Sequence, residues 1–210
     1  MWLHSFTVGV PLSFLDHHLR CGDSLFGEFV GPIERELRER YGLVFSQDVV
    51  RARQAAAGMA RVEELADADI GEVRSSREAF AGVEETTAAM RALLDLTHTA
   101  RWLIPADDAA RFGRERLFGG NYGNPVEIAS GELSPLSGRT GSGIWRGRKR
   151  IEAAEMQAAA AAFIADARAL AAERRFFHWE PAFHGVWTEW ESATPPGGFD
   201  AVIGNPPGIG

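Results

Sequence analysis

Cysteine is almost missing from this sequence, which contains only Cys21 among its 210 residues. A lone cysteine excludes an intramolecular disulfide and is typical of proteins from a reducing cytoplasm. Long hydrophobic runs are missing as well, since none approaches the roughly 18 residues that a membrane-spanning helix needs. The first residues lack the basic region of a secretion signal. These absences predict a cytoplasmic protein with no membrane partner.

Positive charge is also scarce, because 29 acidic residues outnumber 22 basic ones and the net charge is −7. Lysine occurs once, as Lys149, and all the other basic residues are arginines. This balance disfavours a protein that coats nucleic acid with its whole surface. Any contact with double-stranded DNA must therefore be local.

One stretch offers such a local contact. The segment "RTGSGIWRGRKR" contains no acidic residue, includes Trp145, and has the basic residues Arg139, Arg146, Arg148, Lys149 and Arg150. A flexible basic loop beside an aromatic residue can follow a DNA backbone. The alternative is a solvated start of the Ala-rich helix that follows. Both interpretations stay open at this point.

The chain divides into three parts by composition. Residues 1–30 mix apolar residues with Gly and Pro, which predicts a short strand near Leu19 to Cys21 and a turn at Gly22 to Ser24. Residues 31–175 predict a helical insertion, because apolar residues recur there at the spacing of amphipathic helices. Within this block, residues 119–143 are dense in Gly, Ser, Pro and Asn and predict a long loop.

Residues 176–210 return to an α/β pattern. In "GGFDAVIGNPPGIG", the apolar run at residues 199–203 predicts a strand buried on both faces of a parallel sheet. Two short α/β pieces do not complete a doubly wound sheet, which usually has about five or six strands. The sequence therefore predicts a predominantly helical α/β fragment, in which part of a Rossmann-like sheet is interrupted by the long helical insertion.

The turn after that strand has distinctive chemistry. Asn205 lies at the carboxyl end of the strand, where open α/β sheets bind their ligands. Pro206 and Pro207 fix the backbone and remove two N–H donors. The Asn205 side-chain oxygen and the Pro206 carbonyl can therefore converge on one amino group as paired acceptors. Two such acceptors would favour a localised lone pair on an adenine amine, with the transferred methyl supplied by a cofactor.

These residues carry a family resemblance. "FDAVIGNPP" resembles the fourth motif of amino-group-specific DNA methyltransferases, and "PLSFLDHHLRCGDSLFG" is similar to the segment around their third motif. "FFHWEPAFHGVW" resembles a stretch that precedes the catalytic strand in the large adenine-specific enzymes of restriction-modification and phage-defence systems. The three segments occur in the order expected for that family.

The resemblance implies a function and residue roles. The whole enzyme would transfer methyl from S-adenosylmethionine to the amino group of a flipped adenine. Asp23 and Ser24 would bind the cofactor, Asn205 and Pro206 would bind the target amine, and Pro207 would keep the turn rigid. Restriction or defence-system subunits would be further partners.

Two departures from the family pattern limit this expectation. Gly208 replaces the aromatic residue that stacks on the flipped base, and the Gly-rich cofactor loop is not among the 210 residues. The chain is therefore expected to be a fragment that is inactive alone. The alternative function is a non-catalytic helical interaction or DNA-positioning module of a larger defence protein.

Other reactive residue types have simpler interpretations. His17, His18, His178 and His184 form no compact Cys/His cluster, which favours core or surface histidines and predicts no metal site. Cys21 is expected to be a buried small residue. The aromatic cluster is expected to be core packing rather than a base-stacking surface; its members are Phe176, Phe177, Trp179, Phe183, Trp187 and Trp190.

Overall fold

The computed structural model describes residues 19–42, 50, 54, 58–59, 70–139, 141–187 and 197–203. Within these ranges the chain is predominantly helical, as predicted. The elements are α1 (Val30–Tyr41), α3 (Ile70–Trp102), α4 (Asp108–Phe118), α5 (Pro125–Ser130), the 3-10 helix η2 (Pro135–Ser137), β1 (Ile144–Arg146), β2 (Lys149–Ile151), α6 (Ala153–Arg174) and α7 (Trp179–Ala182). No helix in the described ranges is long and apolar enough to cross a membrane.

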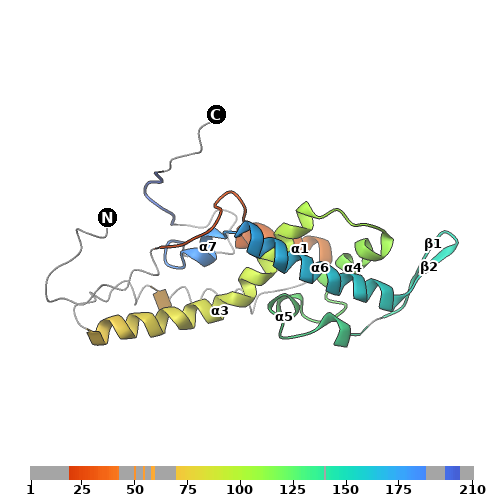
Figure 1. The fold of residues 1–210 in the computed structure, drawn as a ribbon, viewed down its shortest axis with the longest axis horizontal. Helices are drawn as coiled ribbons and strands as arrows, with labels where there is room; N and C mark the ends of the chain where they lie inside the picture. Colours follow the sequence, from red (N-terminus) through yellow and green to blue (C-terminus); the bar gives the residue numbers. More distant parts are fainter. Residues whose placement is uncertain are drawn as a thin grey trace.

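Helix α3 organises the arrangement. Its 33 residues extend for about 50 Å at 1.5 Å per residue. Buried Val83, Thr87, Met90, Leu94 and Thr97 recur every three or four residues, which confirms the predicted amphipathic spacing. Helices α1, α5, α6 and α7 all contact α3. Figure 1 shows the N-terminal half of α3 extending toward one end of the molecule and the β1–β2 hairpin projecting at the other.

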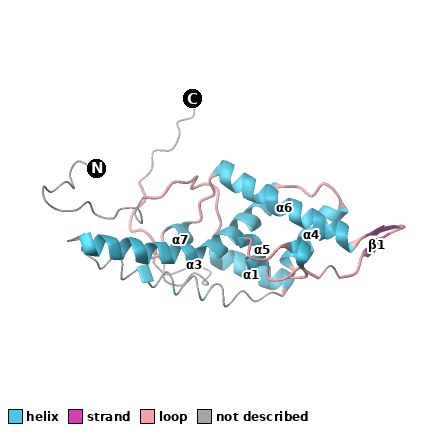
Figure 2. Cartoon of the chain, turned by 60° about the horizontal axis from the view of Figure 1, so that its bottom comes forward, coloured by secondary structure: helices cyan, strands magenta, loops and turns pink. Residues whose placement is uncertain are grey.

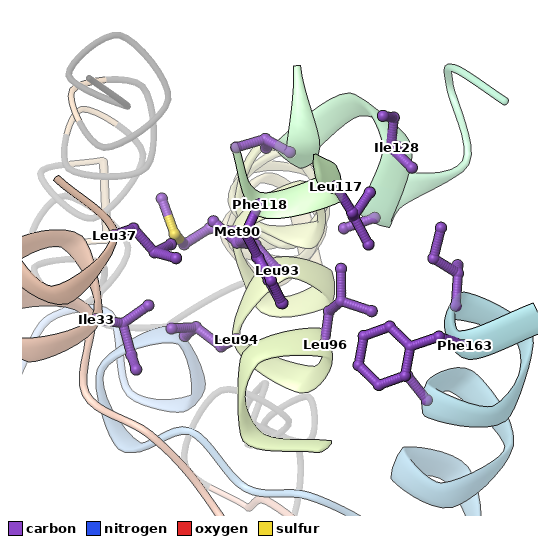
Figure 3. Close-up of a cluster of buried hydrophobic side chains, with 14 of the residues drawn as sticks. Ile33, Leu37, Met90, Leu93, Leu94, Leu96, Leu117, Phe118, Ile128 and Phe163 are labelled. Atoms are coloured by element: carbon purple, nitrogen blue, oxygen red, sulfur yellow. The ribbon is translucent and has the colours of Figure 1, made fainter. Parts of the chain in front are cut away.

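The main core lies where these helices meet. Figure 3 shows the side chains converging from α1, α3, α4, α5 and α6, and the labelled members are Ile33, Leu37, Met90, Leu93, Leu94, Leu96, Leu117, Phe118, Ile128 and Phe163. Leu94 and Leu117 are fully buried. Burying one such side chain stabilises the fold by roughly 1.5–3 kcal/mol.

Helices α4 and α6 pack closely because α4 has a glycine at the contact. A Cβ atom on Gly113 would lie 2.3 Å from the carbonyl oxygen of Met156 and 3.2 Å from the amide nitrogen of Ala160. Any side chain would therefore push the two helices apart. The sequence of α4 thus fixes how near α6 can approach.

The prediction of one long loop over residues 119–143 was wrong, because the segment contains α5 and η2. Asn124 caps α5 by accepting a hydrogen bond from the Val126 N–H at 3.0 Å. Pro125 occupies the first turn, and Gly131 ends the helix with φ 93°. These are ordinary start and stop signals, so a short helix forms within a segment of loop-like composition.

The predicted Ala-rich helix is confirmed as α6, but it begins at Ala153 and not at the preceding basic residues. Arg148, Lys149 and Arg150 instead belong to the turn and second strand of an antiparallel hairpin. Gly147 has φ 59° at the first central position of the two-residue turn, as a type II′ turn requires. The predictions of a flexible loop and of a helix start were therefore both wrong here.

The Rossmann-like sheet is not seen in the described ranges, where the only named sheet is the β1–β2 hairpin. Residues 201–203 have no strand assignment, and the side chains of Val202 and Ile203 are 76% and 97% exposed. A strand buried on both faces needs neighbouring strands, and the described residues offer none beside this run. Figure 2, coloured by secondary structure, shows the dominance of helices.

Candidate functional site

Two segments that are distant in the sequence meet beside α3. Asp23 and Phe176 form a parallel β-bridge. The Asp23 N–H donates to the Arg175 carbonyl at 2.8 Å, and the Phe177 N–H donates to the Phe26 carbonyl at 2.7 Å. We call residues 20–30 and 175–184 together the junction.

Glycines make this close approach possible. A Cβ atom on Gly27 would lie 1.9 Å from the Phe177 carbonyl oxygen, and one on Gly22 would lie 2.5 Å from the Phe177 ring. Arg175 ends α6 in the left-handed region, with φ 53°. This turn directs the chain out of α6 and along residues 22–27. In "CGDSLFG", Gly27 therefore lets the two backbones approach, and Gly22 leaves room for the Phe177 ring.

Asp23, a predicted cofactor-binding residue, lies exposed at this bridge. Its Oδ1 accepts a hydrogen bond from the Leu25 N–H at 3.1 Å, which stabilises the turn that follows. Among the described residues the other carboxylate oxygen has no hydrogen-bond partner. Ser24 is exposed in the same turn. An accessible carboxylate acceptor at the end of a backbone bridge can bind an amino group.

Two histidines hold the junction to α3, and the hydrogen-bond partners of each ring define its tautomer. His178 Nδ1 accepts the Glu28 N–H at 2.9 Å, so His178 Nε2 carries the proton and donates to Asp95 at 3.0 Å. His98 Nε2 accepts from Trp102 Nε1 at 3.0 Å, so His98 Nδ1 donates to Glu28 at 2.8 Å. Each ring thus joins two elements through complementary hydrogen bonds.

Glu180 links α7 to the start of α1. Its Oε2 accepts the Val30 N–H at 2.5 Å, and Val30 is the first residue of α1. Phe29, at the N-cap, has no side chain that could make this bond. Burial raises the pKa of Glu180 to about 7, although the Val30 hydrogen bond opposes the shift. Its Oε1 has no hydrogen-bond partner among the described residues.

A second polar cluster lies further along α3. Glu84 pairs with Arg20 at 2.8 Å and with Arg91 at 2.5 Å. Burial alone would raise the pKa of Glu84, but Arg91 and Arg20 outweigh it and lower the pKa. Burial lowers the pKa of His184 to about 4, so this ring is neutral at neutral pH. His184 Nε2 lies 3.0 Å from Thr87 Oγ1.

A cavity of about 440 Å³ lies between these two clusters. Its wall combines ionisable side chains with aromatic ones; the lining includes Arg20, Cys21, Arg91, Asp95, Phe176, Phe177 and His178. The cavity has the size and mixed polarity of a small-molecule site. It lies on the side of the junction that faces α3.

The structure gives mixed outcomes for the other predicted residues. Asn205, Pro206 and Pro207 lie outside the described residues, as do Gly208, His17, His18 and Trp190. His178 and His184 are buried, as a core interpretation predicts. No group of residues able to hold a metal ion occurs in the described part of the chain. Cys21 is exposed, so the prediction of a buried cysteine was wrong; it precedes the bridge at the surface.

The aromatic cluster is packing, as predicted. Phe177, Trp179 and Phe183 contact one another with ring centroids 5.1 to 6.1 Å apart. Phe199 lies 5.5 Å from Trp187 and 5.2 Å from Phe183. These contacts hold residues 197–199 against the junction. The aromatic rings therefore connect the segment before Asn205 with the segment that contacts Asp23.

Sequence reasoning missed Glu28, Asp95, His98 and Glu180. The one available signal was an acid within an aromatic segment, "FFHWEP", where Glu180 is a poor residue to bury without a partner. Asp95 and His98 lie about one helical turn apart on α3. This spacing does not indicate a functional pair unless their hydrogen-bond partners in the junction are already known.

Comparisons with known proteins do not identify a family for this chain. No protein-family model matches the chain, and no curated protein or solved structure matches it significantly. The sequence motifs and the junction are therefore the features that bear on function.

Proposed function

We propose that the chain is part of an adenine-specific DNA methyltransferase of a restriction or phage-defence system. Residues 1–30 and 176–210 would belong to one Rossmann-like catalytic unit, with residues 31–175 inserted between them. The observation that supports this proposal is the junction. Asp23 pairs in parallel with Phe176 although the α-helical block separates them in the sequence. An insertion must leave and re-enter its host at neighbouring points, and these two segments are neighbours.

The residues at Asp23 fit the adenine end of S-adenosylmethionine. Asp23 has an exposed carboxylate oxygen without a partner among the described residues, and an adenine amine is a hydrogen-bond donor. Ser24, exposed beside it, offers a hydroxyl for the same ligand. When bound, S-adenosylmethionine supplies the electrophilic methyl group. Asp23 would orient the cofactor and take no part in moving protons.

The target base would be held by the other motif. The Asn205 side-chain oxygen and the Pro206 carbonyl would accept the two hydrogens of the adenine amine. Pro207 would restrict the turn so that both acceptors keep their direction. Such preorganised acceptors favour the transition state more than the ground state, because they stabilise the charge that develops on nitrogen. The adenine must leave the duplex to reach them.

Kinetics of the protein expressed from its complete gene test these roles separately. Asp23→Ala removes a charged hydrogen-bond acceptor worth about 1.5–3 kcal/mol, so the KM for S-adenosylmethionine should rise about tenfold or more. Asn205→Ala should lower kcat about a hundredfold or more, in line with loss of a transition-state hydrogen bond. Asn121→Ala, at an exposed asparagine, is the matched control and should change neither value. Full methyl transfer by Asn205→Ala would contradict the proposal.

A second candidate is a non-catalytic module that positions DNA or a protein partner. Its support is the helical block, which has its own core and presents the basic β1–β2 hairpin at one end. This candidate expects DNA binding that is unchanged by Asp23→Ala and Asn205→Ala. It also expects no methyl transfer from the complete gene product.

A further inference from the structure

The β1–β2 hairpin has an anchored face. Ile144 pairs with Ile151 in the register, and both pack with Ala109 and Phe112 of α4. Arg146, two residues along the same strand, forms an ion pair with Asp108 of α4 at 2.9 Å. The isoleucine contacts hold the base of the hairpin against α4, and the Arg146 ion pair holds β1 against α4 near the turn. Figures 1 and 2 both show the remainder projecting beyond the helices.

The opposite face carries an exposed aromatic ring, and two cations without an ion pair among the described residues lie at the turn end of the hairpin. Trp145 pairs with Arg150 across the hairpin, and the Trp145 side chain is 70% exposed. Arg150 has an ion pair with Glu152 at 3.2 Å. Arg148 and Lys149 have no ion pair among the described residues. We call Trp145, Arg148 and Lys149 the hairpin tip.

The charge of the tip contrasts with that of the rest of the chain. No acidic residue occurs between Glu132 and Glu152, although the whole chain has a net charge of −7. A projecting cationic element on an acidic protein concentrates attraction for a polyanion at one point. A membrane surface would require a broader set of exposed apolar side chains than one indole. The tip therefore suits a narrow, repeating array of negative charge.

We propose that the hairpin tip binds the phosphate backbone of duplex DNA. Arg148 and Lys149 would each neutralise a phosphate, and Trp145 would pack its ring on the sugars and donate its N–H to a phosphate oxygen. Because the hairpin base is already fixed on α4, binding orders little additional backbone. The choice of DNA among polyanions depends on the proposed function. Arg146 and Arg150 already form ion pairs with Asp108 and Glu152, so they would have a secondary role in DNA binding.

Salt-dependent binding to a short duplex tests the proposal. Arg148→Ala combined with Lys149→Ala removes two phosphate contacts, so the slope of log K against log salt should decrease by about 1.8. Affinity at 0.1 M salt should fall on the order of tenfold to a hundredfold. Arg40→Ala combined with Arg74→Ala removes the same charge at exposed ion pairs on α1 and α3, and should leave the slope unchanged. Equal slope changes in the two double variants would overturn the proposal.

Two further measurements separate the possible failures. Trp145→Ala should weaken DNA binding without changing the salt slope, while circular dichroism should stay native because the ring is exposed. Methyl transfer with DNA in excess should survive the hairpin substitutions, since only the KM for DNA depends on the tip. If the Arg148 and Lys149 double variant transfers methyl normally and binds DNA as tightly as the wild-type protein, the hairpin proposal is wrong and the proposed function is unaffected. If DNA binding depends on the tip but the protein transfers no methyl group, the proposed function is wrong and the hairpin proposal is unaffected. Preference for single-stranded RNA, anionic vesicles or an acidic peptide over duplex DNA would also contradict the assignment.

Discussion

Replacing Glu180 by glutamine should change how stability depends on pH. Burial raises the pKa of Glu180 from 4.5 to about 7. The stabilising contribution of this group is fully present below about pH 4.5 and is lost as the pH rises through about 7. At 1.36 kcal/mol for each pKa unit, this rise corresponds to about 3 kcal/mol. A glutamine side chain at this position would keep an oxygen for the Val30 N–H and would not ionise.

The assay is urea unfolding of the wild-type protein and Glu180→Gln at pH 5 and pH 8. Their free energies of unfolding should differ by less than about 1 kcal/mol at pH 5, and the variant should be more stable by up to about 3 kcal/mol at pH 8. The free energy of unfolding is compared between the two proteins at each pH, because His184 also titrates in both. Its pKa is lowered to about 4, so its contribution to stability is lost as the pH falls, opposite in direction to that of Glu180. Glu132→Gln, at an exposed glutamate, is the control. An equal difference at both pH values would show that Glu180 does not have a raised pKa in the folded protein.

Two further predictions concern the backbone. Gly113→Ala should destabilise the protein by about 1–3 kcal/mol, because the new Cβ would meet the Met156 carbonyl. Gly82→Ala should stabilise α3 by about 0.5–1 kcal/mol, because there is open space around Gly82 and alanine favours a helix more than glycine does. Thermal melts with shifts of the same sign would contradict this contrast. Arg175→Gly should stabilise the protein by about 1 kcal/mol, because Arg175 has a positive φ of 53°. A lower melting temperature would instead indicate that the Arg175 side chain stabilises the junction.

Local patterns predicted the helices but not all their limits. Val83, Met90 and Leu94 follow a helical spacing, and all three are buried in the folded protein. The sequence pattern therefore sufficed to predict α3. Residues 148–150 sit beside a strong Ala-rich helix, yet the turn at Gly147 pairs them with residues 144–146. The short hairpin has little sequence signal of its own, and the anchoring of Ile144 and Ile151 on α4 stabilises it.

The junction could be predicted only in outline. The motifs assigned residues near Asp23 and residues after 176 to one unit, which stays a prediction; the structure shows that a parallel bridge joins Asp23 to Phe176. The hydrogen bonds from Val30 to Glu180 and from Glu28 to His178 join residues 150 positions apart. No periodicity encodes a pair at that separation. Such contacts follow from the packing of α7 on α3, which a single sequence does not reveal.

The most direct test of the proposed methyltransferase activity is methylation of duplex DNA by the protein expressed from its complete gene. The protein is incubated with S-adenosylmethionine and duplex DNA, and the nucleosides are then identified by mass spectrometry. We predict N6-methyladenine with the wild-type protein and its loss with Asn205→Ala. The absence of methylated adenine with the wild-type protein, or methylation on cytosine in its place, would contradict the account.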